Sequence, residues 1–291
     1  MSIPPSFDPA FYAVEAGLDF ASTDDALAHF TDIGKRRGLK GSPGCNQGYF
    51  LRLIQQMRPG AVLEIGPGAA PRLVGANVYY FDVKTEDELR QRYGSERSID
   101  EIPERIHFVD SEGDLGVIDR KFDVVFSSHV IEHSVDLVAH LNQVRSLLND
   151  GGHYFLVIPN RMYTFDFYKP ATVVEDVIAA HMHPAGSDYH FLRSYLLEVF
   201  RRTHNDPGQH WAGNHGEAKG FDGKAGGLTR AYEDVAGRPV ARSGFHRWMF
   251  DEDSFVDVMG ALYRIEFSPL RVRECYNTAA GSMSFNAILS L

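Results

Sequence analysis

The segment Val62-Leu63-Glu64-Ile65-Gly66-Pro67-Gly68 joins a short apolar run to a glycine-rich tip. This pattern is typical of a buried parallel strand whose carboxyl end carries a ligand site. Glycine allows the backbone to approach a ligand closely. The next apolar run, Val78–Phe81, ends at Asp82, whose carboxylate can accept hydrogen bonds from both hydroxyls of a ribose. Together these strand ends predict a site for a nucleoside cofactor.

Further apolar runs extend the pattern into a sheet. Strands are expected over 61–65, 78–81, 106–109, 122–126, 153–158, 265–272 and 283–289. A helix that starts at Ser134 separates the fourth strand from the fifth, and another over 252–262 precedes the last two. This alternation predicts an α/β fold, a Rossmann-like, doubly wound, mostly parallel seven-stranded sheet.

Two segments lie outside this alternation. Residues 1–45 are expected to form a small helical N-terminal unit, with a helix from Thr23 to Gly34, and residues 46–291 form the main domain. After the fifth strand, residues 160–245 break the rhythm and include a stretch rich in glycine and histidine. Long irregular segments in compact domains are usually functional or disordered. We therefore expect an insertion after the fifth strand that builds or covers the site.

Composition excludes several classes of protein. The chain has 291 residues, 44% of them hydrophobic, and its formal net charge of −10 disfavours nucleic acid as a partner. No apolar stretch approaches the length of a membrane span, and the first residues lack the features of a secretion signal, so we expect a cytoplasmic protein without membrane insertion. Cys45 and Cys275 have no motif spacing and are expected to be free thiols.

The glycine segment departs from the fingerprint of dinucleotide-binding proteins, because Pro71 stands where G-x-G-x-x-G requires its third glycine. A nicotinamide-dependent dehydrogenase is therefore disfavoured. The chain instead resembles the class I S-adenosylmethionine-dependent methyltransferases. The motifs that carry this resemblance are Val62–Gly68, Phe81-Asp82, Asp110-Ser111, Phe122–His133 and Leu147–Pro159, in the order that the family has them.

The resemblance implies S-adenosyl-L-methionine as the cofactor and a role for each motif. Glu64 would support the loop that contains Gly66 and Gly68 and the methionine part of the cofactor, and Asp82 would bind the ribose. Asp110 and Ser111 would contact the adenine, while Ser128 and His129 would line the cofactor edge that faces the acceptor.

Two shorter resemblances concern the acceptor. Phe7–Tyr12, with Ala26–Phe30 and Gly34–Gly38, is similar to a helical module often fused to bacterial glycosyltransferases and surface-glycan proteins. Thr203–Pro207, with His210–Gly216, is similar to an insertion in methyltransferases associated with the same systems. Both favour a sugar hydroxyl, on a small molecule or a glycan precursor.

An alcohol acceptor requires a general base, and histidine or a carboxylate is the usual choice. Among 13 histidines, we expect this base to be His204, His210 or His215, which lie close together with Trp211. Trp211 would either stack on a sugar ring or pack in the interior. His129 is expected to line the cofactor pocket and His133 to have a structural role.

The remaining histidines suggest no metal. His181 and His183 lack a third ligand nearby in the sequence, and His129 and His133 lack the glutamate that follows the first histidine of a zinc-protease helix. His246 and Trp248 are expected to be packing residues. We therefore expect an O-methyltransferase without a metal. The alternatives are a small-molecule or peptide methyltransferase of specialised metabolism and a non-catalytic scaffold.

Overall fold

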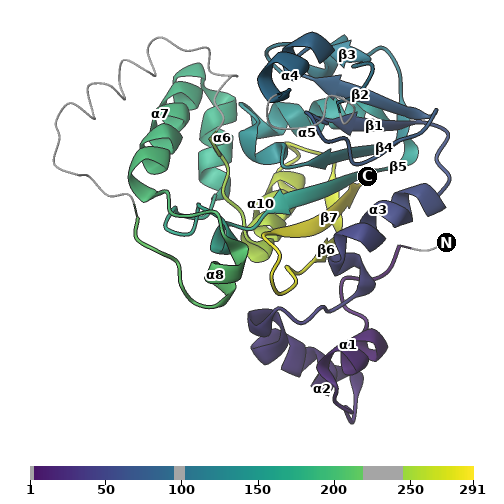
Figure 1. Ribbon diagram of the computed structural model, residues 1–291, viewed down its shortest axis with the longest axis vertical. Helices are drawn as coiled ribbons and strands as arrows, with labels where there is room; N and C mark the ends of the chain where they lie inside the picture. Colours follow the sequence, from purple (N-terminus) through teal and green to yellow (C-terminus); the bar gives the residue numbers. More distant parts are fainter. Residues whose placement is uncertain (1–2, 95–101, 219–244) are drawn as a thin grey trace.

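The computed structural model describes residues 3–94, 102–218 and 245–291 (Figure 1). These residues form a seven-stranded sheet with the strand order β3-β2-β1-β4-β5-β7-β6. Strands β1 to β5 run parallel, and β7 is antiparallel to both β5 and β6. The strands are β1 (Val62–Ile65), β2 (Val78–Asp82), β3 (Phe108–Val109), β4 (Phe122–Ser128), β5 (Leu148–Pro159), β6 (Arg271–Tyr276) and β7 (Ser284–Ser290). The expected mostly parallel, doubly wound sheet is confirmed.

Helices cover both faces of this sheet (Figure 1). Val125 of β4 packs in one apolar cluster with Leu141, whereas Val124 and Phe126 pack in the other with Phe50. Successive strand residues point to opposite faces, so strands covered on both sides have continuous apolar sequences. The helices beside the sheet are α3 (Gln47–Gln56), α4 (Glu86–Tyr93), α5 (Leu137–Leu147) and α10 (Glu252–Arg264).

Helix α5 begins later than the sequence predicts. The helix starts at Leu137, and its N-cap is Asp136, whose side chain accepts a hydrogen bond from the Ala139 N–H. Ser134 ends a separate 3₁₀ turn, η6 (Ile131–His133), and donates to the Ile131 carbonyl. The expected start at Ser134 was therefore wrong, because a second short turn lies between β4 and the helix.

The strand expected over 265–272 was also placed too early. Helix α10 extends to Arg264, and the N–H groups of Phe267 and Ser268 both bond to the Leu262 carbonyl at its end. Pro269 follows and has no N–H for a sheet ladder. Strand β6 accordingly begins at Arg271.

The first residues form a small helical unit with its own apolar cluster of Tyr12, Ala26 and Phe30. Its elements are α1 (Pro9–Ala16), α2 (Thr23–His29), the π turn η1 (Phe30–Gly34) and the 3₁₀ turns η2 (Lys35–Arg37) and η3 (Pro43–Cys45). The expected stop at Gly34 was wrong, because Gly34 stays in a right-handed conformation and the chain turns at Gly38, where φ is 68°.

Hydrogen bonds attach this unit to the C-terminal strands. Asn277, which follows β6, accepts from the Gly41 N–H at 3.0 Å and donates to the Leu39 carbonyl at 3.0 Å. Asn286 of β7 donates to the Gly44 carbonyl at 2.8 Å.

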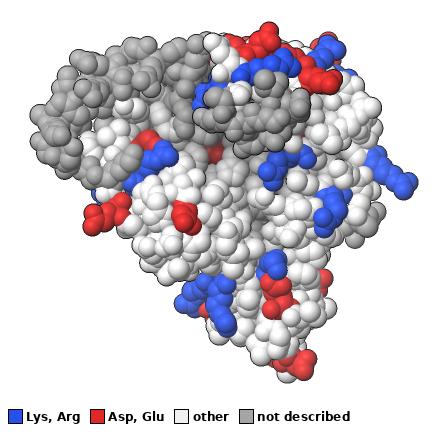
Figure 2. Space-filling view, viewed as in Figure 1, with Lys and Arg blue, Asp and Glu red and all other residues white. Residues whose placement is uncertain are grey.

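On the face shown in Figure 2, charges of both signs are interspersed over the N-terminal unit. Within this unit, the side chains of Lys40 and Glu15 form an ion pair.

After β5, the described residues up to 218 include three α-helices. They are α6 (Val174–Met182), α7 (Pro184–Arg201) and α8 (Pro207–Trp211), and α6 packs against both α5 and α7 (Figure 1). The last part of the expected insertion, residues 219–244, lies outside the described residues. Among the helices of the described segments, we find none that is long and apolar enough to cross a bilayer.

Replacing Asn277 by alanine should loosen the N-terminal unit. The change leaves the buried Gly41 N–H and Leu39 carbonyl without a partner, and each such group costs about 1–3 kcal/mol. We expect a lower free energy of unfolding in urea and faster amide exchange over residues 38–46. Asn142→Ala is the control, since Asn142 makes one exposed hydrogen bond. Equal stability of the two variants would contradict this attachment.

Candidate active site

The carboxyl ends of β1, β2 and β4 surround a cavity of about 680 Å³. The chain order of the sheet reverses between β1 and β4, the position where open α/β sheets bind their ligands. Of the eight residues that the resemblance assigns to the cofactor, five line this cavity: Gly66, Gly68, Asp82, Ser111 and His129.

The glycine loop brings backbone rather than side chains to the cavity. Gly66 and Gly68 have φ values of 69° and 53°, a left-handed conformation that favours glycine. A Cβ at Gly66 would lie 2.7 Å from Cγ2 of Val130, whereas one at Gly68 would meet nothing within 4 Å. Gly66 therefore needs a hydrogen for packing, and Gly68 presents its backbone to open space.

Glu64 supports this loop through hydrogen bonds to the residues that follow it. Its buried carboxylate accepts hydrogen bonds from the N–H groups of Arg72 at 2.8 Å and Leu73 at 2.9 Å. Burial raises the pKa of Glu64 to about 7. Glu64 is not among the residues that line the cavity. Its visible role is thus to fix the chain that follows the glycine loop.

Asp82 places a carboxylate in the cavity wall. Its oxygens accept from the Gly68 N–H at 3.1 Å and the Lys84 N–H at 3.0 Å, which fixes the side chain between the glycine loop and the end of β2. Burial raises the pKa of the Asp82 carboxyl. Each oxygen keeps further acceptor capacity, as a contact to ribose hydroxyls requires.

Two of the expected cofactor residues act from behind the cavity wall. Asp110 accepts hydrogen bonds from the N–H groups of Glu112 and Asp114, and it thereby shapes the turn that presents Ser111. Ser128, at the end of β4, is not a lining residue, although the adjacent His129 is. Apolar Val109 and Leu115 also line the cavity near Ser111.

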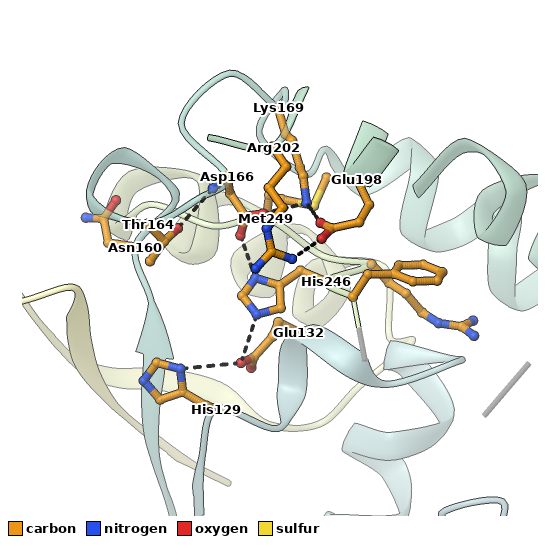
Figure 3. Close-up of polar contacts among 12 residues, drawn as sticks. His129, Glu132, Asn160, Thr164, Asp166, Lys169, Glu198, Arg202, His246 and Met249 are labelled. Atoms are coloured by element: carbon orange, nitrogen blue, oxygen red, sulfur yellow. Dashed lines mark hydrogen bonds and ion pairs between the residues drawn. The ribbon is translucent and has the colours of Figure 1, made fainter. Parts of the chain in front are cut away.

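A second group of polar residues lies next to the cavity (Figure 3). Glu132, in η6, is fully buried, and neither carboxylate oxygen has a hydrogen-bond partner among the described residues. Its Oε1 lies 3.7 Å from Nδ1 of His129, 3.8 Å from Nε2 of His133 and 3.7 Å from Nε2 of His246. These four residues are called the Glu132 cluster below. His129 and His133 also line the cavity.

Backbone bonds bring His246 to this cluster. The Glu132 carbonyl accepts from the N–H groups of Arg247 at 2.8 Å and Trp248 at 3.1 Å. The Trp248 indole donates to the Ser134 carbonyl at 2.7 Å. His246 is thereby held against η6, although more than a hundred residues separate them in the sequence.

A chain of buried charges continues behind His246 (Figure 3). Nδ1 of His246 lies 2.5 Å from Oδ2 of Asp166, and Oδ1 of Asp166 lies 2.7 Å from Nζ of Lys169. Nζ of Lys169 donates at 2.6 Å to Glu198 of α7, which also pairs with Arg202. The segment after β5 therefore orients His246 through ion pairs.

The surroundings shift the pKa values of these groups in opposite directions. Burial raises the pKa of Glu132 to about 7 and lowers the pKa values of His129 and His133 to about 4. For Asp166, burial acts upward, but the charge and hydrogen bond of His246 dominate and hold the pKa at about 2. Burial opposes the charged form of His246, yet the Asp166 carboxylate raises its pKa.

A family comparison identifies the protein class. A family model described as a methyltransferase domain matches residues 42–214, more than half of the chain. The chain belongs to this methyltransferase family. S-adenosyl-L-methionine is its cofactor, in agreement with the glycine loop and the Asp82 carboxylate. A search of curated proteins finds no match.

Solved methyltransferase structures match the chain at low identity and low TM-score. The glycopeptide N-methyltransferase MtfA is 20% identical over 40% of this chain, with a TM-score of 0.29, and 54% of that protein is covered. The match thus spans about half of that protein's length. The magnesium protoporphyrin IX methyltransferase ChlM from Synechocystis PCC 6803 is 12% identical over 94% of this chain and 87% of its own, with a TM-score of 0.37.

The structure brings the three expected base candidates of this methyltransferase together, but away from the cofactor cavity. His204 and His210 stack at 4.2 Å between ring centroids, and Nδ1 of His210 lies 3.1 Å from Nδ1 of His215. None of the three is among the lining residues. Nε2 of His204 donates to the Asn214 carbonyl, and Nδ1 of His204 accepts from the Asp206 N–H. These rings therefore stabilise the loop around α8.

Trp211 likewise has a packing role. Its ring stacks on Tyr163 at 3.9 Å between centroids, and its N–H donates to the Ser282 carbonyl at 2.8 Å. Of the two roles considered for Trp211 in the sequence, these contacts favour packing over a sugar platform.

Sequence reasoning missed the residues around the Glu132 carboxylate. Glu132 lies between His129 and His133 in the fourth-strand motif, which gave a local signal. Asp166 and Lys169, three residues apart in an otherwise apolar and aromatic segment, gave a weaker one. His246 was expected to be a packing residue, because nothing near it in the sequence reveals its carboxylate partners.

Asp82→Ala should weaken the binding of S-adenosylmethionine and S-adenosylhomocysteine by about tenfold or more, because hydrogen bonds to a charged group contribute about 1.5–3 kcal/mol. Calorimetric titration measures both affinities. Asp87→Ala, at an exposed residue of α4, is the control and should bind like the native chain. Unchanged affinities in the Asp82 variant would contradict the ribose assignment.

Proposed function

We propose that this methyltransferase transfers the methyl group to a hydroxyl of an acceptor that binds beside the Glu132 cluster. The observation that carries this proposal is the position of His129 and His133, which belong both to the cofactor cavity and to the cluster. The same two imidazoles therefore line the cofactor cavity and contact the Glu132 carboxylate.

The chemistry of methyl transfer explains why such a cluster favours an oxygen acceptor. When bound, S-adenosylmethionine supplies a methyl group that is already activated on its sulfonium sulfur. The protein then has to align the acceptor and exclude water. A neutral amine can react with little help, whereas an alcohol has to lose its proton to a nearby base. The imidazoles of His129 and His133 at the cavity wall, with the buried Glu132 carboxylate behind them, supply this capacity.

We further propose a sugar on a small molecule or a cytoplasmic glycan precursor as the acceptor. The support is the similarity of the first residues to a module fused to glycosyltransferases, together with the apolar cluster of Tyr12, Ala26 and Phe30 near the N-terminus. The N-terminal unit would bind a partner or the acceptor chain, while residues 46–291 carry the cofactor site. A peptide or other small-molecule acceptor is the competing outcome of the assay below.

Glu132→Gln should reduce methyl transfer to hydroxyl acceptors by about 100-fold or more, the range of general acid–base contributions. Cofactor affinity should change less than threefold, because Glu132 does not line the cavity. The assay measures transfer of radiolabelled methyl groups to nucleotide sugars, glycosides, amines and peptides, and the exposed His181→Asn is the control. Transfer to amines alone, unaffected by Glu132→Gln, would contradict the proposal.

A further inference from the structure

Within the part of the chain that the structure describes, neither oxygen of the buried Glu132 carboxylate has a hydrogen-bond partner. Lys169 contacts the carboxylates of Asp166 and Glu198, and Arg202 contacts Glu198. Among the described residues, the groups of opposite charge nearest the Glu132 carboxylate are the imidazoles of His129, His133 and His246. An unpaired buried charge is strongly destabilising, so a positive charge is needed next to Glu132.

Each imidazole of the Glu132 cluster is fixed by a partner on its outer side. Nε2 of His129 lies 2.9 Å from the Ser284 hydroxyl, and Nδ1 of His133 donates at 3.0 Å to the Phe245 carbonyl. Nδ1 of His246 faces the Asp166 carboxylate. The second nitrogen of each ring points toward Glu132. Histidine ligands of metal ions have this arrangement, in which an outer carboxylate or carbonyl fixes the ring.

The distances within the cluster fit a bridging ion better than direct hydrogen bonds. Each ring nitrogen lies 3.7 to 3.8 Å from Glu132 Oε1, beyond hydrogen-bond distance. Donor atoms of Glu132, His133 and His246 all lie within 4.8 Å of one another. Two ligands that are each about 2.1 Å from one ion are about 3.0–3.4 Å apart. Binding therefore requires His133 and His246 to move a few tenths of an ångström toward Glu132 Oε1 and to close any larger gap between their own nitrogens.

We propose that Glu132, His133 and His246 bind a divalent first-row transition-metal ion. Imidazole nitrogens with one carboxylate suit Zn²⁺, Mn²⁺ or Fe²⁺, whereas Mg²⁺ prefers oxygen ligands. Asp166 is a positioning residue that orients His246. The proposed metal replaces the metal-free site expected from the sequence.

The ion would lie beside the cofactor cavity, because His129 and His133 line it. A metal ion would lower the pKa of a coordinated hydroxyl, whose proton would then pass to water, so that the cluster would act through the ion and not as the base itself. This activating role rests on the proposed function, whereas the binding site itself rests on the geometry of the cluster alone.

The first test is metal content and affinity. Untagged full-length protein, purified without chelator, is analysed by mass spectrometry for metals, then stripped with EDTA and titrated with Zn²⁺, Mn²⁺ and Mg²⁺. We expect about one transition-metal ion per chain. Glu132→Gln and His246→Asn should bind it at least 100-fold more weakly, and Asp166→Asn about 10–100-fold more weakly. His181→Asn should bind it like the native chain. Circular dichroism confirms that each variant is folded.

The outcomes test the metal site and its proposed role in activating the hydroxyl independently of each other. If the folded native chain takes up no ion, or takes up only Mg²⁺, or if Glu132→Gln binds as well as the native chain, the metal site is wrong and an imidazolium of His246 neutralises Glu132. If the ion binds but its removal leaves hydroxyl methylation unchanged, the activating role is overturned. If the ion binds and no hydroxyl is methylated, the proposed function fails while the site stands.

Discussion

The buried carboxylate of Glu132 is the constraint on which this region of the molecule depends. Removing an ionised carboxylate from water carries a free-energy penalty of several kcal/mol, so compensating groups have to be held around it. Three imidazoles converge on Glu132 from the end of β4, from η6 and from the segment before α10. Its own carbonyl holds that last segment in place through Arg247 and Trp248. One turn therefore positions both the charge and its partners.

The segment after β5 is coupled to this turn by electrostatics. Asp166 and Lys169 lie before α6, and Glu198 lies on α7, yet their charges form one buried chain that ends at His246. In a low-dielectric interior, such a chain is stable only when each charge has its partner. A displacement of α7 would thus affect the orientation of His246 directly. The insertion expected from the sequence contributes to the site in this way, through residues that do not themselves line the cofactor cavity.

The difference between what the sequence predicted and what it missed follows from the range of the interactions. The sheet, the glycine loop and Asp82 were predictable, because each depends on a strand and the few residues after it. Helix and strand ends were predicted less well, as at Ser134 and near 265, where short turns and carbonyl contacts set the boundary. The pairing of His246 with Asp166 spans 80 residues and had no local signal. The dense histidines at 204–215 were conspicuous in the sequence, but their partners are largely one another and the loop.

The two parts of the candidate site differ in how far apart their residues lie in the sequence. The cofactor half of the site consists of backbone groups and one carboxylate close together in the chain, so a family model that covers residues 42–214 identifies it. The Glu132 cluster, beside which we propose that the acceptor binds, includes His246, which lies beyond that match, and depends on the charges that orient it. Substitutions in the second half can change the acceptor without disturbing the glycine loop or Asp82. Membership of the family therefore establishes the methyl donor, and the Glu132 cluster is where the choice of acceptor has to be sought.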